Sequence, residues 1–199
     1  MFTDDLMYSS KLEVKRQVDG KADHRHDLAI DPAEEALFPS KYMPAGLVFS
    51  RDATGKIAKI GCVGNKIPFF LFNKTNTPMA SLLGAPADTT AGSAGGYIGG
   101  GERMNRFYSG MGHFEVSTTE YKKDDTYAVD DPLYAAGFAT PATYDALAGR
   151  VRKGAYNTTQ CIIGVVSQPC TAGAPSKNVH SMDALHFTAC FIPYRADPA

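Results

Sequence analysis

The sequence predicts an all-β protein: an antiparallel β-barrel or sandwich with an extended N-terminal arm and a long Gly/Ala-rich connector. Two segments, residues 113–121 and 185–191, alternate apolar and polar side chains with a period of two, which is typical of half-buried strands. The 19 Gly and 12 Pro residues favour frequent turns. Hydrophobic residues, at 44%, are sufficient for a core, and no segment predicts a helix longer than about three turns.

Residues 1–35 are expected to form the arm, because they mix both charge signs with few large apolar side chains. Such a segment does not bury enough surface on its own to offset its chain entropy, so it is either a frayed tail or an arm that orders on a neighbour. One short helix is predicted near its end, with Asp31 as N-cap, Pro32 at N1 and Glu34 at N3, before Pro39 stops it.

Residues 36–199 are expected to form one β domain of about eight strands. A hairpin is predicted over residues 46–60, with Gly55 taking a positive φ in its loop. Further strands are expected in the apolar run at residues 67–72, in the two alternating segments, and near residues 131–134, 149–152 and 162–166. Residues 82–101 form the predicted flexible connector.

Charge and targeting signals set several classes of protein aside. Lys and Arg number 20 against 21 Asp and Glu, so the net charge of −1 argues against a nucleic-acid partner. The first five residues contain two acids and no secretory pattern, and the apolar runs fall short of the roughly 18 residues of a membrane span. We therefore expect synthesis in a cytoplasm, no membrane partner, and reduced, buried thiols at Cys62, Cys161, Cys170 and Cys190.

No motif in the sequence predicts catalysis, a cofactor or a metal ion. The glycines at residues 92–101 do not have the spacing of a nucleotide-binding loop. His24 and His26 share one side of an extended segment, but a metal site would need further ligands from elsewhere. The paired carboxylates lie in hydrophilic surroundings, which do not raise a carboxyl pKa for acid catalysis.

Scattered short segments over residues 42–195 nevertheless resemble structural proteins of tailed bacteriophages. DPLY at residues 131–134, AGRV at 148–151 and IIGVV at 162–166 resemble a run found in small phage structural proteins. AGLV at residues 45–48 with ATGKI at 53–57 is similar to a hairpin of head decoration proteins. Residues 67–73 and 114–121 are similar to segments of larger phage cement proteins.

This resemblance implies a non-enzymatic decoration, or cement, protein on the outside of a mature phage capsid. Its implied partners are the major capsid protein, whose neighbouring subunits it would clamp, and further copies of itself in a homotrimer. We expect the contacts to come from the arm and from the only bulky apolar residues of the connector segment at 92–101. The candidate contact residues are Leu12, Val14, Val18, His24, His26, Tyr97 and Ile98.

Two alternatives remain at this point. One is a tail or neck component of the virion, built from similar β modules. The other is a small β-barrel enzyme or ligand-binding protein that uses His113, His180 or His186. Convergence of two of these histidines on a carboxylate in one pocket would favour the second alternative.

Overall fold

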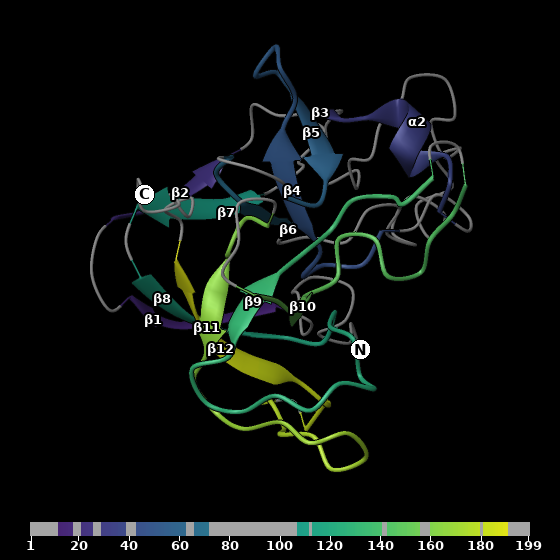
Figure 1. Ribbon diagram of the computed structural model, residues 1–199. Coiled ribbons are helices and arrows are strands. Elements are labelled where there is room, and N and C mark those ends of the chain that lie inside the picture. Colours follow the sequence, from purple (N-terminus) through teal and green to yellow (C-terminus); the bar gives the residue numbers. More distant parts are fainter. Residues whose placement is uncertain are drawn as a thin grey trace, which may run out of the picture.

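The structure is a computed structural model that describes residues 12–17, 21–25, 29–38, 43–62, 66–71, 107–111, 113–140, 143–155, 160–179 and 181–190. Within these residues the chain forms twelve strands and one short helix, arranged in two sheets that are antiparallel at all but one strand pair (Figure 1). The prediction of an all-β protein is thereby confirmed at the level of fold class. None of the described helices has the length and apolar character that a membrane crossing requires.

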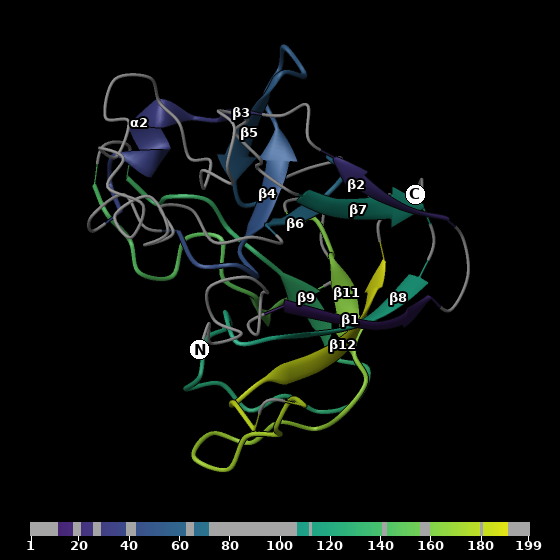
Figure 2. The same cartoon turned by 180° about the vertical axis from the view of Figure 1, so that it is seen from behind.

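The first sheet, called sheet A, contains the two segments whose alternation is clearest in the sequence. These are β8 (His113–Thr118) and β12 (Leu185–Cys190), which pair along their whole lengths at the sheet centre. From edge to edge, sheet A consists of β1 (Leu12–Gln17), β8, β12, β11 (Gly164–Val166), β9 (Pro132–Tyr134) and β10 (Arg152–Lys153). Its described strand pairs are antiparallel, and Figure 2 shows β1 beside β8, seen from behind.

The second sheet, sheet B, contains the predicted hairpin. Its order is β2 (Lys21–Arg25), β7 (Phe107–Met111), β6 (Phe69–Leu71), β4 (Val48–Arg51), β5 (Ile57–Ile60) and β3 (Ala29–Ile30). Strands β4 and β5 form the hairpin, and Gly55 has a φ of 74° in its loop, as expected. The Asp52 carboxylate closes this loop by accepting hydrogen bonds from the Thr54 hydroxyl at 2.8 Å and the Ile57 amide at 3.1 Å.

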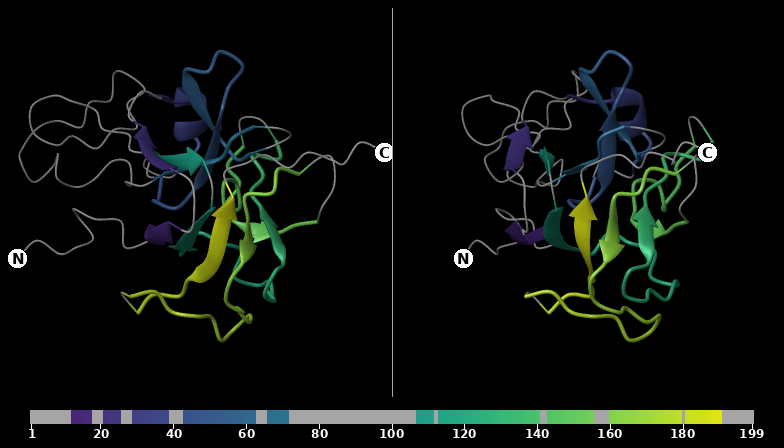
Figure 3. Two further views of the ribbon diagram at one scale, coloured as in Figure 1. Left: turned by 90° about the vertical axis from the view of Figure 1, so that its left-hand side faces the viewer. Right: turned by 60° about the vertical axis from the view of Figure 1, so that its left-hand side comes forward.

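The central strands β6 and β4 of sheet B are buried on both faces, which explains why they begin with or consist of apolar runs and do not alternate. Val48 and Phe70 belong to a core shared with sheet A, where the rings of Phe70 and Phe187 lie 5.8 Å apart. Their neighbours Phe49 and Phe69 belong to a second core on the opposite face of sheet B. Figure 3 shows the strands of sheet B above those of sheet A.

The second core is covered partly by the short helix α2 (Pro32–Glu35). Asp31 is its N-cap, because the Asp31 carboxylate accepts a hydrogen bond from the Ala33 amide, and Pro32 occupies the first turn. The Glu34 carboxylate accepts a hydrogen bond from the Ile60 amide at 2.7 Å, which ties the helix to β5. The predicted helix start is therefore confirmed, and the helix is only four residues long.

The segment expected to be an arm contributes strands to both sheets. β1 pairs with β8 in sheet A, whereas β2 and β3 pair with β7 and β5 in sheet B. The pairing offsets the chain entropy that this polar segment could not offset alone, and it places strands from before residue 36 in the same sheets as the domain. The predicted connector at residues 82–101 lies outside the described residues.

The described strands outnumber the eight or so expected, because several contain only two or three residues. Strands this short, such as β3 and β10, contain no full alternation for the sequence to show. They exist because a longer neighbour supplies hydrogen bonds, as β5 does for β3.

Candidate functional site

One end of sheet A carries two loops, residues 119–131 and 167–183, which we call the loop end. The loops are joined by paired backbone hydrogen bonds between Tyr127 and Cys170, at 2.8 and 3.0 Å. A pocket of about 540 Å³ lies beside them. Its lining comes from both loops and from the segment before β10: Thr119, Glu120, Tyr121, Lys122, Lys123, Asp124, Leu147, Arg150, Met182 and Asp183.

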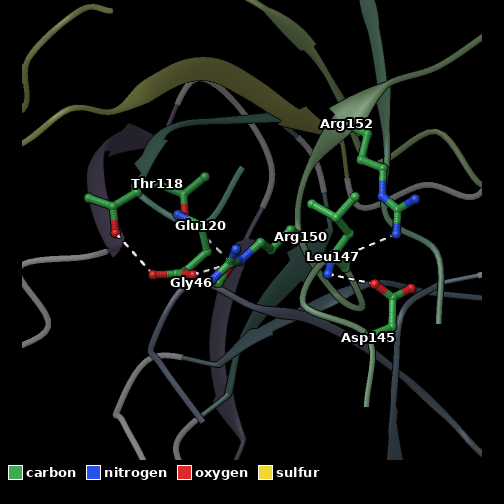
Figure 4. A network of polar contacts seen from close by, with 8 residues as sticks. Gly46, Thr118, Glu120, Asp145, Leu147, Arg150 and Arg152 are labelled. Atoms are coloured by element: carbon green, nitrogen blue, oxygen red, sulfur yellow. Dashed lines mark hydrogen bonds and ion pairs between the residues drawn. The ribbon is translucent and has the colours of Figure 1, made fainter. Parts of the chain in front are cut away.

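A half-buried ion pair forms one wall of this pocket. The Arg150 guanidinium donates from Nε to Glu120 Oε2 at 3.1 Å, and the Glu120 side chain is almost fully buried (Figure 4). The Glu120 carbonyl also accepts a hydrogen bond from the Val151 amide at 3.0 Å, and the Lys122 amide donates to the Val151 carbonyl at 2.9 Å. Because Glu120 is held by both its backbone and its side chain, the wall is rigid and its charge is neutralised.

Further ion pairs at the loop end involve pocket-lining residues. Lys122 Nζ lies 2.6 Å from Asp125 Oδ1, and Lys177 pairs with Asp183. The side-chain hydrogen bond from Lys177 holds the pKa of Asp183 below its ordinary value. Burial raises the pKa of the Tyr121 phenol, with a further contribution from the Cys170 thiol, so Tyr121 is a neutral hydroxyl at physiological pH. Eight of the ten lining residues have polar or charged side chains, so the pocket is suited to a polar ligand.

Both loops are stiffened internally, and each carries an exposed apolar side chain. In the first loop, the Tyr127 hydroxyl donates to the Lys122 carbonyl at 2.8 Å. In the second, the Asn178 side-chain oxygen accepts from the Met182 amide at 2.9 Å. Val129 and Val179 are nevertheless 51% and 78% exposed, although aliphatic side chains of this size are usually buried. The loop end is therefore a preorganised surface of mixed charge with two exposed valines.

A second polar group lies on the face of sheet A opposite its core. Glu13, Ser117 and His186 occupy directly opposed positions on β1, β8 and β12. The Ser117 hydroxyl donates to Glu13 Oε2 at 2.9 Å, and His186 Nε2 donates to the Lys177 carbonyl at 3.0 Å. Because the serine proton is directed to the carboxylate and the imidazole holds a loop carbonyl, this row is arranged as structural support for residues 177–179.

The histidines of the enzyme alternative are only partly placed by the structure. His186 is buried on β12, and His113 lies on β8 with its backbone paired to Cys190. The His113 side chain and all of His180 lie outside the described part of the chain. Within the described residues, no group of three or more His, Cys, Asp or Glu side chains is arranged to hold a metal ion.

Of the seven expected contact residues, the structure describes Leu12, Val14 and His24. Leu12 is 1% exposed and belongs to the core between the sheets, so we withdraw it as a contact residue: its period-two position on β1 points it inward. Val14 lies on β1 in sheet A and His24 on β2 in sheet B, in strands whose backbones pair with Val116 and Tyr108. Val18, His26, Tyr97 and Ile98 lie outside the described residues.

Sequence reasoning missed the loop end, although its parts carried signals. Asp130 and Ser181 adopt positive φ values of 68° and 60° next to Val129 and Val179. Asp and Ser are residue types that favour turns, and this was the signal in the sequence. What the sequence does not show is that two segments about 50 residues apart are adjacent, since that depends on the order of strands in sheet A.

Comparison with known proteins adds no relative. No family model matches the chain, and neither the curated proteins nor the solved structures contain a significant match.

Proposed function

We propose that this protein is a non-enzymatic structural protein of a tailed-phage virion that binds the outside of the mature capsid. In this proposal the two sheets form a sandwich, and the protein bridges neighbouring subunits of the major capsid protein. Copies of the protein would associate as a trimer on that lattice, with no cofactor. The basis is the resemblance of residues 42–195 to phage structural proteins, together with the surface of the loop end.

The observation that carries the proposal is the pair of exposed valines on internally bonded loops. A loop that is already ordered loses little conformational entropy when it docks, so its contacts contribute more of their energy to binding. The Lys177–Asp183 ion pair flanks Val179 along the chain, and the Lys122–Asp125 pair lies in the same loop as Val129, so each exposed valine would have charged neighbours at an interface.

The stabilising mechanism is mass action on the assembled lattice. A ligand that binds only the assembled shell adds RT ln(1 + [L]/Kd) per site to the stability of that shell. Since each bound copy contacts more than one capsid subunit in this proposal, separating those subunits would also require loss of the bound copy.

A sedimentation assay with expanded empty shells tests this proposal. The wild-type protein should pellet with the shells. The double variant Val129→Asp/Val179→Asp should bind at least about tenfold more weakly, because each introduced aspartate would bury a charge in the interface. Ile67→Asp is the matched control, since Ile67 is also about half exposed but lies outside the loop end.

The outcomes separate two claims. Failure of the wild-type protein to bind any shell would refute the capsid function. Equal binding by the double variant and the wild type would remove the loop end as the docking surface. Binding to isolated tails instead of shells would favour the tail or neck alternative.

A further inference from the structure

Two thiols from different sheets meet in the core. Cys62 follows β5 of sheet B, and Cys161 precedes β11 of sheet A. The Sγ atoms of both residues lie 3.3 Å from one acceptor, the carbonyl oxygen of Lys66. Hydrogen bonding between the two side chains also shifts the pKa of each thiol, in opposite directions.

The backbone holds both thiols against the same segment of sheet A. The Cys62 amide donates to the Ala135 carbonyl at 2.8 Å, directly after β9. Two residues after Cys161, the Ile163 amide donates to the Leu133 carbonyl of β9 at 2.9 Å. These bonds fix the approach of the two residues, so their proximity is a property of the fold and does not depend on side-chain rotation alone.

We propose that Cys62 and Cys161 are a latent disulfide site that cross-links sheet A to sheet B when the protein meets a disulfide oxidant such as glutathione disulfide. The inference does not depend on the proposed capsid function. It assigns disulfide formation to two cysteines that lie about 100 positions apart, a spacing that does not indicate a disulfide in the sequence.

The two thiols have different roles in the reaction. Hydrogen bonding from Cys62 lowers the pKa of Cys161, whereas hydrogen bonding to Cys161 and burial raise the pKa of Cys62. Cys161 is therefore the attacking thiolate. It bonds to one sulfur of glutathione disulfide and breaks the S–S bond, which releases one glutathione thiolate.

The second step closes the cross-link. Cys62 loses its proton to solvent and attacks the Cys161 sulfur of the mixed disulfide, which releases the second glutathione. Two protein thiols are oxidised, one glutathione disulfide is reduced to two glutathiones, and the electrons balance. Both thiols are buried, but Lys66 and Ile67 beside them are exposed, so opening of this surface segment admits the oxidant.

The cross-link closes a loop of about 100 residues, so it restricts the unfolded chain strongly. We expect the melting temperature of the oxidised protein to rise by about 10 °C. Reduction with dithiothreitol should reverse this rise.

The test is disulfide mapping of the full chain after incubation with glutathione disulfide, with the remaining thiols blocked by iodoacetamide. Trypsin leaves Cys161 and Cys170 in one peptide, residues 154–177, so the mapping uses both the wild type and Cys170→Ala. Cys170→Ala also serves as the matched control, because Cys170 is a buried cysteine outside any disulfide, with its sulfur 3.8 Å from the Tyr121 hydroxyl. The expected product joins peptide 60–66 to peptide 154–177 in both proteins.

Cys62→Ala and Cys161→Ala should each lack this product and the reversible rise in melting temperature. Complete alkylation of Cys62 in the Cys170→Ala protein at glutathione equilibrium would overturn the proposal. So would a link from Cys62 to Cys190 as the main product. Since the mapping is done on the wild type as well, the result does not depend on the folding of a variant.

Discussion

At the scale of single residues, His186 shows how burial sets protonation in this fold. It is 2% exposed on β12, and its Nδ1 atom has no hydrogen-bond partner among the described residues. Burial lowers the pKa of the imidazole, and the positive charge of Lys15 lowers it further, against the smaller opposing effects of the Lys177 carbonyl and Glu13. The folded protein therefore holds His186 neutral at a pH where the unfolded chain would protonate it.

This difference predicts a pH dependence of stability. As the pH falls below about 6.5, the pKa of His186 in the unfolded chain, the unfolded state binds a proton at His186 and the folded state does not. The free energy of unfolding therefore decreases. The decrease continues until the lowered folded pKa is reached. Urea unfolding of the wild type between pH 7.5 and pH 5 should show this loss.

His186→Gln is the informative variant, because its side-chain amide can donate to the Lys177 carbonyl but does not titrate. The variant should show a flatter pH profile over the same interval than the wild type. Parallel profiles would show that other groups cause the dependence.

At the scale of elements, close contact between β11 and β12 depends on Gly164. A Cβ atom at this position would lie 2.5 Å from the Thr188 carbonyl oxygen and 2.9 Å from Phe187 Cδ2. Because β12 is a central strand of sheet A, the backbone oxygen cannot move away without disturbing its pairing with β8.

Gly164→Ala should therefore destabilise the protein by about 1–3 kcal/mol through steric conflict, as measured by chemical unfolding. Gly173→Ala is the control, since Gly173 has a φ of 80° but nothing within 4 Å of an added Cβ. Its cost is conformational only, roughly 1 kcal/mol. A Gly164→Ala protein as stable as the wild type would contradict the close approach of the two strands.

The elements that the sequence predicts well are those whose signals are local. Alternation identified β8 and β12, the turn residues identified the β4–β5 hairpin, and Asp31 with Pro32 identified the start of α2. The strand β1 was not predicted, because its charged residues suggested a frayed tail or an arm that orders on a neighbour. Its inward side chain, Leu12, becomes visible as core only when β8 is beside it.

At the scale of the whole molecule, the decisive features come from strand order, which the sequence does not display. Sheet A places β12 between β8 and β11, and this order brings the loops of the loop end together. Sheet B separates two cores, so adjacent residues such as Val48 and Phe49 face different ones. The meeting of the Cys62 and Cys161 thiols at one carbonyl oxygen has the same origin, since it requires both sheets to be in place.

The proposed function also belongs to this scale, because a lattice-binding protein is defined by where it is found and in what number. A protein that clamps capsid subunits must be present on most equivalent sites of the shell, and it must be accessible from outside. Its net charge of −1 is compatible with a position away from the packaged genome.

The proposed function is tested most directly by the protein composition of purified virions whose genome carries this sequence, separated into heads and tails. Quantitative mass spectrometry should find the protein in the head fraction, in near-stoichiometric ratio to the major capsid protein, and accessible to surface proteolysis on intact particles. Its absence from the heads, or its presence only in the tail fraction, would contradict the account.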